Sequence, residues 1–181
     1  MVRVLGFIPC RSGSKRIIDK NLSLFNSKSL IQNVYDKAED SKCIDNIVVS
    51  TDSEKYIKTL NKGEKFLDIG LRSLSNSLDN SNDLDVLKEV NEKLKQFDLI
   101  FDYIVHLRPT YPALNYYHID EAFNFFKKNP KATSLKSVEK LDLYFQKCLV
   151  GDKNDPERLV GLDGDTRNKS SSTPSQECQN I

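Results

Sequence analysis

The residues with the clearest chemical potential lie between Cys10 and Asn21, where the sequence reads CRSGSKRIIDKN. Four cations fall within ten residues of this segment: Arg11, Lys15, Arg16 and Lys20. A guanidinium can bind two phosphate oxygens at once, an ammonium acts as a point charge, and Gly13 allows backbone N–H groups to approach an anion closely. The segment therefore indicates either a polyphosphate site or a solvated basic turn, and its charges alone do not distinguish the two.

Two common phosphate-binding motifs are absent from this segment. It lacks the GxxxxGK[ST] spacing of a P-loop, and its single glycine cannot satisfy GxGxxG. The formal net charge of the 181 residues is +1, so no global positive field would attract nucleic acid. Any anion site must be local, and nucleic acid is not expected as a partner.

The cysteines and the hydropathy pattern indicate a cytoplasmic protein. The four cysteines form no CxxC pair and lie near no histidine cluster, which argues against a zinc site and a disulfide framework. The short apolar start runs into basic residues, which is the wrong order of charges for a secretory signal. No apolar stretch approaches the roughly 20 residues needed to cross a bilayer, so no membrane partner is expected.

The polar segments are connected by a pattern of alternating strands and helices. Apolar runs predict strands at residues 2–9, 46–51, 65–69, 101–107, 133–138 and 144–150. Apolar spacing of three and four predicts helices after Ser29, from Asp52 or Ser53 to Gly63, over 84–97 and around 119–126. The alternation predicts an α/β fold with a mostly parallel sheet and helices on both of its faces.

We expect one compact domain over residues 1–150. The polar remainder, 151–181, has almost no periodicity and is expected to be a loop, an excursion toward a partner subunit or a disordered remnant. In parallel sheets, ligands bind beyond the carboxyl ends of the strands. The segments expected to gather at that edge all follow predicted strands: 10–21, 51–53, 71–83 and 108–112.

The order of residues in several segments resembles one enzyme family. Residues 8–21, IPCRSGSKRIIDKN, closely resemble the IPARSGSKRIPGKN signature of the acylneuraminate cytidylyltransferases, the CMP-sialic acid and CMP-legionaminic acid synthetases and their relatives. Further matches follow in the same order: IVVSTDSE at 47–54, an R…L…D loop at 72–85, VHLRPTYPAL at 105–114 and a strand at 133–138. The resemblance implies a Rossmann-like three-layer nucleotidyltransferase fold, with residues 1–150 as the cytidylyltransferase domain.

The resemblance also implies roles for individual positions. The residues matched to nucleotide binding are Arg11, Ser12, Gly13, Ser14, Lys20, Asn21, Arg72, Asp79 and Asn82. Among these, Arg11 and Lys20 are matched to the catalytic residues that stabilise the leaving pyrophosphate, and Arg72 to an arginine near the cytosine. Arg108 and Thr110 are matched to positions facing the sugar, and a guanidinium suits a sugar that carries a carboxylate.

The implied reaction transfers CMP from CTP to a nonulosonic, sialic-acid-like sugar acid. The anomeric hydroxyl attacks the α-phosphate and pyrophosphate leaves, with Mg²⁺ as the implied cofactor. The family's metal-binding aspartates follow a QxxPxxYxxNG-like stretch, and the sequence matches its start at Gln176 but ends at Ile181 before the tyrosine. The metal ligands are therefore left unassigned and a C-terminally truncated chain is expected. The family's dimer region implies a homodimer through residues 144–160.

The sequence departs from the signature at three positions: Ile18 replaces a proline, Asp19 a glycine and Tyr111 a small serine. Two other functions stay open. One is a truncated, inactive nucleotide-binding homologue. The other is a sugar-1-phosphate nucleotidyltransferase, which is disfavoured because those enzymes prefer a more glycine-rich first loop. The sequence does not identify the sugar acid.

Some candidate residues also have ordinary structural interpretations. Arg72 could be a surface arginine, Arg108 could pair with Asp102, and Asp52 is expected to cap the helix that follows it. Two histidines are expected to be structural, on a strand and on a helix surface respectively: His106 and His118.

Overall fold

The computed structural model describes residues 2–14, 17–78, 81–138, 149–151 and 159–161. The chain divides into two compact units, Met1–Leu135 and Lys136–Ile181. In the second unit, β6 (Leu149–Gly151) pairs antiparallel with β7 (Leu159–Gly161). The predicted dimer region at 144–160 lies largely outside the described residues. The expected division into residues 1–150 and a tail of 151–181 stays a prediction, as does the homodimer.

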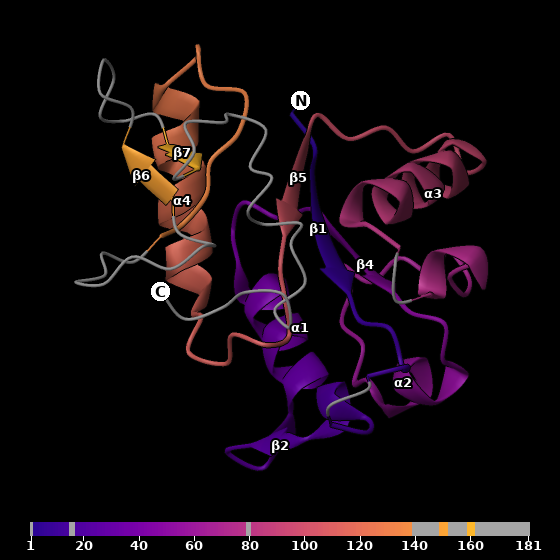
Figure 1. The fold of residues 1–181 in the computed structure, drawn as a ribbon. Helices are drawn as coiled ribbons and strands as arrows, with labels where there is room; N and C mark the ends of the chain where they lie inside the picture. Colours follow the sequence, from indigo (N-terminus) through magenta and orange to yellow (C-terminus); the bar gives the residue numbers. More distant parts are fainter. Residues whose placement is uncertain (1, 15–16, 79–80, 139–148, 152–158, 162–181) are drawn as a thin grey trace. The chain divides into compact units, whose positions relative to one another are not determined.

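The first unit is built on a parallel sheet of three strands in the order β4-β1-β5 (Figure 1). The strands are β1 (Val4–Pro9), β4 (Asn46–Ser50) and β5 (Tyr103–His106). All three were expected from their apolar runs, and their observed bounds are slightly shorter. The expected strand at 65–69 makes a single parallel bridge, between Phe66 and Ile47, and is otherwise an extended segment beside β4.

Four helices connect and cover these strands: α1 (Leu30–Asp40), α2 (Glu54–Thr59), α3 (Asp83–Lys95) and α4 (Tyr116–Lys128). The predicted cap of α1 is confirmed, since the Ser29 side chain accepts a hydrogen bond from the Gln32 N–H at 3.2 Å. Helix α2 ends well before Gly63 and is therefore shorter than predicted. No helix in the described part of the chain combines the length and apolar character needed to cross a membrane.

Alternating side chains of the sheet divide the core into two layers. On β1, Val4 and Ile8 pack with α1 and α4, whereas Leu5 and Phe7 pack with α3. This alternation is the period-2 geometry of a strand buried on both faces. The three-layer arrangement predicted from the sequence is confirmed.

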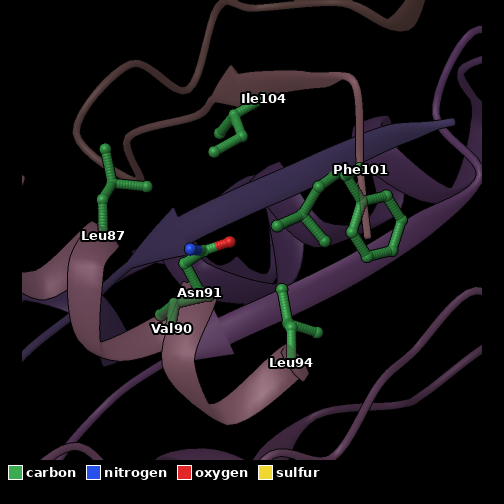
Figure 2. Close-up of a pocket in the computed structure, with 7 residues that line it drawn as sticks. Leu87, Val90, Asn91, Leu94, Phe101 and Ile104 are labelled. Atoms are coloured by element: carbon green, nitrogen blue, oxygen red, sulfur yellow. The ribbon is translucent and has the colours of Figure 1, made fainter. Parts of the chain in front are cut away.

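On the α3 side, the apolar stripe of the helix meets the strand at the sheet edge. Figure 2 shows Leu87, Val90 and Leu94 lying opposite Phe101 and Ile104. These residues line a cavity of about 20 Å³. A cavity of that size has room for little more than a water molecule, so it is a packing gap and no ligand site.

One predicted strand in the described residues is wrong. Residues 133–138 have no regular structure, and their side chains are all exposed. Leu135 and Val138, the apolar residues of this segment, are 45% and 60% exposed. A strand needs a ladder partner as well as an alternating pattern, and no described strand pairs with this segment.

Two short features lead from the first loop into α1. The 3₁₀ turn η1 (Lys20–Leu22) is followed by a hairpin of β2 (Leu24–Phe25) and β3 (Lys28–Ser29). The Leu30 N–H donates to the Ser23 carbonyl at 3.0 Å, so the hairpin closes directly onto the start of the helix. This connection holds Lys20 at the end of the basic loop.

Candidate functional site

A cleft of about 200 Å³ opens beyond the carboxyl ends of the strands. The loops after β1 and β5 line it, together with the segment that leads into α3. Its lining residues are Pro9, Cys10, Arg11, Ser14, Lys20, Asn21, Arg72, Asn76, Leu78, Ser81, Asp83, Val86, Arg108, Pro109 and Thr110. The predicted gathering of these loops at one edge of a parallel sheet is therefore confirmed.

The basic loop is held by hydrogen bonds to the neighbouring strand and to its own far end. The Ser12 N–H and hydroxyl donate to the two carboxylate oxygens of Asp52, at 2.7 and 2.8 Å. On the other side, the buried Asn21 amide donates to the Arg11 carbonyl at 3.1 Å. The expectation that Asp52 caps α2 is wrong. Ser53 is the N-cap residue and makes no side-chain hydrogen bond there. The Asp52 carboxylate is not available to cap the helix because it binds Ser12 in the loop that follows β1.

Arg11 and Lys20 line the same cleft from the two ends of this loop. The Arg11 guanidinium donates to the Ser77 carbonyl at 3.4 Å, across the cleft from its own loop. No described residue provides a hydrogen-bond or ion-pair partner for the Lys20 ammonium. The loop therefore presents converging positive charge to the cleft, as a polyphosphate site requires. Lys15 and Arg16 lie outside the described residues.

An unusual backbone conformation places Lys20. Asp19 adopts the left-handed conformation, with φ 51°, at the point where η1 begins. Its carboxylate accepts hydrogen bonds from the Lys55 ammonium at 2.7 Å and from the hydroxyl of buried Tyr56 at 3.2 Å. The bond from Lys55 lowers the pKa of Asp19. Aspartate tolerates this conformation better than most residues, which explains why it can replace the glycine of the family signature.

Arg72 is a buried residue of the cleft wall, so the alternative of a surface arginine is wrong. Its side chain donates to the Ser50 hydroxyl at 3.0 Å and to the Ser50 carbonyl at 2.6 Å, and the residue is 8% exposed. Burial lowers the pKa of Arg72, and neighbouring acidic groups oppose that effect. Beside it, burial raises the pKa of Cys10 to about 12, which favours the protonated thiol over the nucleophilic thiolate.

Glu89 on α3 holds the segment that follows Arg72. Its carboxylate accepts hydrogen bonds from the Ser73 N–H at 2.8 Å, the Ser73 hydroxyl at 2.6 Å and the Asn76 amide at 2.7 Å, and it pairs with Lys93 at 2.9 Å. Burial alone would raise the pKa of Glu89, but these bonds outweigh it and lower the pKa to about 2. Glu89 thereby fixes Asn76 in the cleft wall.

We predict that Glu89→Gln lowers the free energy of unfolding by about 2 kcal/mol at pH 7. A pKa depressed from about 4.5 to about 2 corresponds to at most about 3 kcal/mol, and the side chain is 15% exposed, so part of this is screened. The contribution is present above pH 4.5 and is lost as the pH falls through 2. Urea unfolding between pH 7 and 2 should show the difference between the two proteins shrinking with acid. Glu92→Gln, an exposed glutamate of the same helix, is the control. A Glu89 variant as stable as this control would contradict the assignment.

The remaining predicted residues occupy different positions. Asn82 caps α3, its side-chain oxygen accepting the Asp85 N–H at 2.9 Å, and it does not line the cleft. Asp79 lies outside the described residues. Arg108 and Thr110 line the cleft, and Arg108 is ion-paired with Asp83 at the start of α3.

The expectation that Arg108 could pair with Asp102 is wrong. Asp102 instead accepts the Arg3 N–H at 2.7 Å, because it lies at the opposite, amino end of β5.

Sequence reasoning also missed three polar lining residues: Asn76, Ser81 and Asp83. Asp83 fell at the boundary of a predicted helix, where acidic residues are common, and nothing in the sequence paired it with Arg108.

Both histidines have structural roles, as expected. The His106 ring stacks at a tilt on Phe7, with centroids 5.2 Å apart; the residue is exposed, and the partial loss of solvent around its ring lowers its pKa. His118 lies on the exposed surface of α4 and accepts the Asn115 N–H at 3.1 Å in a capping box.

In the described part of the chain, no three His, Cys, Asp or Glu residues cluster as metal ligands would. Cys10 and Cys43 are free thiols.

Residues 5–162 match the sequence profile of a family described as cytidylyltransferase. The chain belongs to the cytidylyltransferase family. It is 33% identical to the CMP-N,N'-diacetyllegionaminic acid synthase of Legionella pneumophila, over 78% of this chain and 60% of that protein. It is 32% identical to the 3-deoxy-manno-octulosonate cytidylyltransferase of Thermodesulfovibrio yellowstonii, over 79% of this chain and 56% of that protein. An N-acylneuraminate cytidylyltransferase of Streptococcus agalactiae is 31% identical over 86% and 37%, respectively.

Solved cytidylyltransferase structures have the same fold. A CMP:2-keto-3-deoxy-manno-octonic acid synthetase complexed with CTP superposes with a TM-score of 0.56 at 22% identity, over 71% of this chain and 48% of that one. A cytidylyltransferase from Leptospira borgpetersenii gives a TM-score of 0.52 at 20% identity, over 71% and 50%. The chain therefore spans 60% or less of the length of these named relatives.

Proposed function

We propose that this member of the cytidylyltransferase family transfers CMP from CTP to an acidic sugar and releases pyrophosphate. One observation carries the proposal: Arg11, Lys20 and buried Arg72 line a single cleft at the carboxyl edge of the sheet. A triphosphate carries several negative charges, and fixed cations in a partly desolvated cleft bind it far more strongly than cations in bulk water. The three named relatives, one synthase of a CMP-activated sugar acid and two cytidylyltransferases named for sugar acids, support the same reaction.

Such a transfer needs positioning and charge stabilisation more than covalent help from the protein. The sugar hydroxyl attacks the α-phosphorus and loses its proton to solvent, the bond to the bridging oxygen breaks, and the electron pair leaves with pyrophosphate. Arg11 and Lys20 would hold the β- and γ-phosphates and stabilise the charge that develops on the leaving group. The Ser14 hydroxyl lines the same part of the cleft and can donate to a phosphate oxygen.

Arg108 is the proposed partner of the sugar carboxylate. It lines the cleft with Thr110, and a guanidinium binds a carboxylate through two parallel hydrogen bonds. Because Asp83 already pairs with Arg108, the sugar acid must share this guanidinium with Asp83 or displace it. The names of the relatives include legionaminic, octulosonic and neuraminic acids, whose shared feature is the acid group, so the substrate is proposed at that level.

Mg²⁺ stays a proposal that the described residues support only weakly. Mg²⁺ binds through one or two carboxylates together with phosphate oxygens. Among the described residues that line the cleft, Asp83 is the one carboxylate, and it is paired with Arg108. These residues do not by themselves make a metal site.

The experiment is an assay of pyrophosphate release from CTP in the presence of MgCl₂, with a panel of nonulosonic and octulosonic acids. We expect release with CTP and at least one acid sugar, and none when the sugar's carboxylate is methylated. Release with UTP or GTP in place of CTP would overturn the base assignment. Binding of CTP without release for any sugar would support the alternative of an inactive nucleotide-binding homologue.

A further inference from the structure

Asp52 anchors the basic loop from outside the cleft. Its Oδ1 accepts the Ser12 N–H at 2.7 Å and its Oδ2 accepts the Ser12 hydroxyl at 2.8 Å, across 40 residues of sequence. Both bonds are short and charge-assisted, and both are partly buried. Asp52 is not one of the cleft's lining residues, so its carboxylate is engaged with the loop and not with the space that a ligand would fill.

Other hydrogen bonds attach the loop at Arg11: the Asn21 amide donates to its carbonyl at 3.1 Å, and its guanidinium donates to the Ser77 carbonyl at 3.4 Å. Ser12 lies between Arg11 and Gly13, and a Cβ atom placed on Gly13 would meet nothing within 4 Å. Arg11 and Ser14, on either side, are only partly buried. Because these residues are not fully buried, hydrogen bonds contribute to their order, and the Ser12 anchor helps to set where Arg11 and Ser14 enter the cleft.

We propose that Asp52 is a positioning residue that pre-orders residues 11–14 for the phosphates of CTP. The identity of the ligand rests on the proposed function, whereas the anchoring of the loop does not. A loop that is disordered in the free protein must be ordered on binding, and that cost appears as weaker affinity. A loop already held by Asp52 avoids the cost.

The sign of the effect separates positioning from simple electrostatics. Asp52 carries a negative charge close to a site proposed for a polyanion. If the carboxylate acted only through its charge, its removal would tighten CTP binding. If Asp52 acts by positioning the loop, its removal weakens CTP binding, although an unfavourable charge has been lost.

Two substitutions distinguish these effects further. Asp52→Ala removes both acceptors. Asp52→Asn removes the charge but keeps the geometry, since its carbonyl oxygen can accept the Ser12 N–H and its amide can donate to the Ser12 hydroxyl, which also accepts. Asp120→Ala is the matched control. Asp120 likewise accepts a serine hydroxyl, from Ser41 at 2.7 Å, and two backbone N–H groups, from Lys42 at 3.2 Å and Cys43 at 3.0 Å, and none of these donors lines the cleft.

The full chain and these three variants are compared by calorimetric titration with CTP and by NMR hydrogen exchange at the Ser12 amide. We expect Asp52→Ala to weaken CTP binding about tenfold and to accelerate Ser12 exchange at least tenfold. Asp52→Asn should stay within about threefold of the parent in both, and Asp120→Ala should leave both unchanged, even where its melting temperature falls as far as that of Asp52→Ala.

Three results would overturn the positioning role: Ser12 exchange unchanged in Asp52→Ala, CTP affinity unchanged or tighter in that variant, or an equal loss of affinity in Asp120→Ala. A parent protein that does not bind CTP would refute the proposed function instead. In that case the exchange rate of the Ser12 amide still decides whether Asp52 anchors the loop.

Discussion

Replacement of Lys20 by alanine is expected to reduce kcat/KM for pyrophosphate release about 100-fold. Lys20 lines the cleft, and no described residue neutralises its ammonium, so the charge is available to a ligand. In other enzymes, removal of one pre-oriented hydrogen-bond donor to the negative charge that develops in the transition state lowers kcat by about two orders of magnitude. The fold should tolerate the change, since the side chain contributes no hydrogen bond to the described structure, and the free energy of unfolding should fall by less than about 0.5 kcal/mol.

The comparison that isolates this effect uses another lysine. Lys58 on α2 is 75% exposed and pairs with Glu54 at 2.7 Å, so Lys58→Ala removes the same chemical group at a position that does not line the cleft. It should leave kcat/KM within twofold of the parent. Lys20→Arg, which keeps the charge in a different shape, should recover part of the activity. Equal activities for Lys20→Ala and Lys58→Ala would show that Lys20 does not contact the reacting phosphates.

Replacement of Arg72 by alanine is the second large change, and it should affect stability as well as binding. The substitution removes the two hydrogen bonds that Arg72 donates to Ser50. The buried Ser50 carbonyl then lacks one of its donors. We expect the free energy of unfolding to fall by about 2–3 kcal/mol, and CTP affinity to fall at least tenfold at a temperature where the variant remains folded.

Arg72→Lys separates the two consequences. An ammonium keeps the positive charge but cannot reproduce the planar pair of bonds to the Ser50 hydroxyl and carbonyl. Thermal unfolding and CTP titration should therefore place it between the parent and Arg72→Ala in both properties. An unfolding temperature of Arg72→Ala equal to that of the parent would contradict a buried, hydrogen-bonded Arg72 guanidinium.

The parts of this fold that could be predicted from the sequence are those whose signals are local. Strand β1 follows from a short apolar run, the start of α1 from the hydroxyl of Ser29, and α3 from apolar residues spaced by three and four. The collection of polar loops at one edge follows from the parallel arrangement of the strands. These rules fix where the cleft lies and which basic loop enters it.

The details that could not be predicted depend on contacts between distant residues. Asp52 looked like a helix cap because its neighbours in sequence form one, yet its hydrogen bonds go to Ser12 on the adjacent strand's loop. In the same way, burial of Arg72 depends on Ser50, and the partner of Arg108 is set by where α3 begins. Local patterns of charge carry no information about such partners.

The proposed function requires the cleft to hold the phosphates of a nucleoside triphosphate between Arg11 and Lys20. Calorimetric titrations of the parent chain with CTP and with CMP at equal ionic strength test it most directly, because the two ligands differ only in the β- and γ-phosphates. We expect CTP to bind at least tenfold more tightly than CMP, and Lys20→Ala to remove most of this difference. Equal affinities for the two nucleotides, in a protein that binds both, would contradict it.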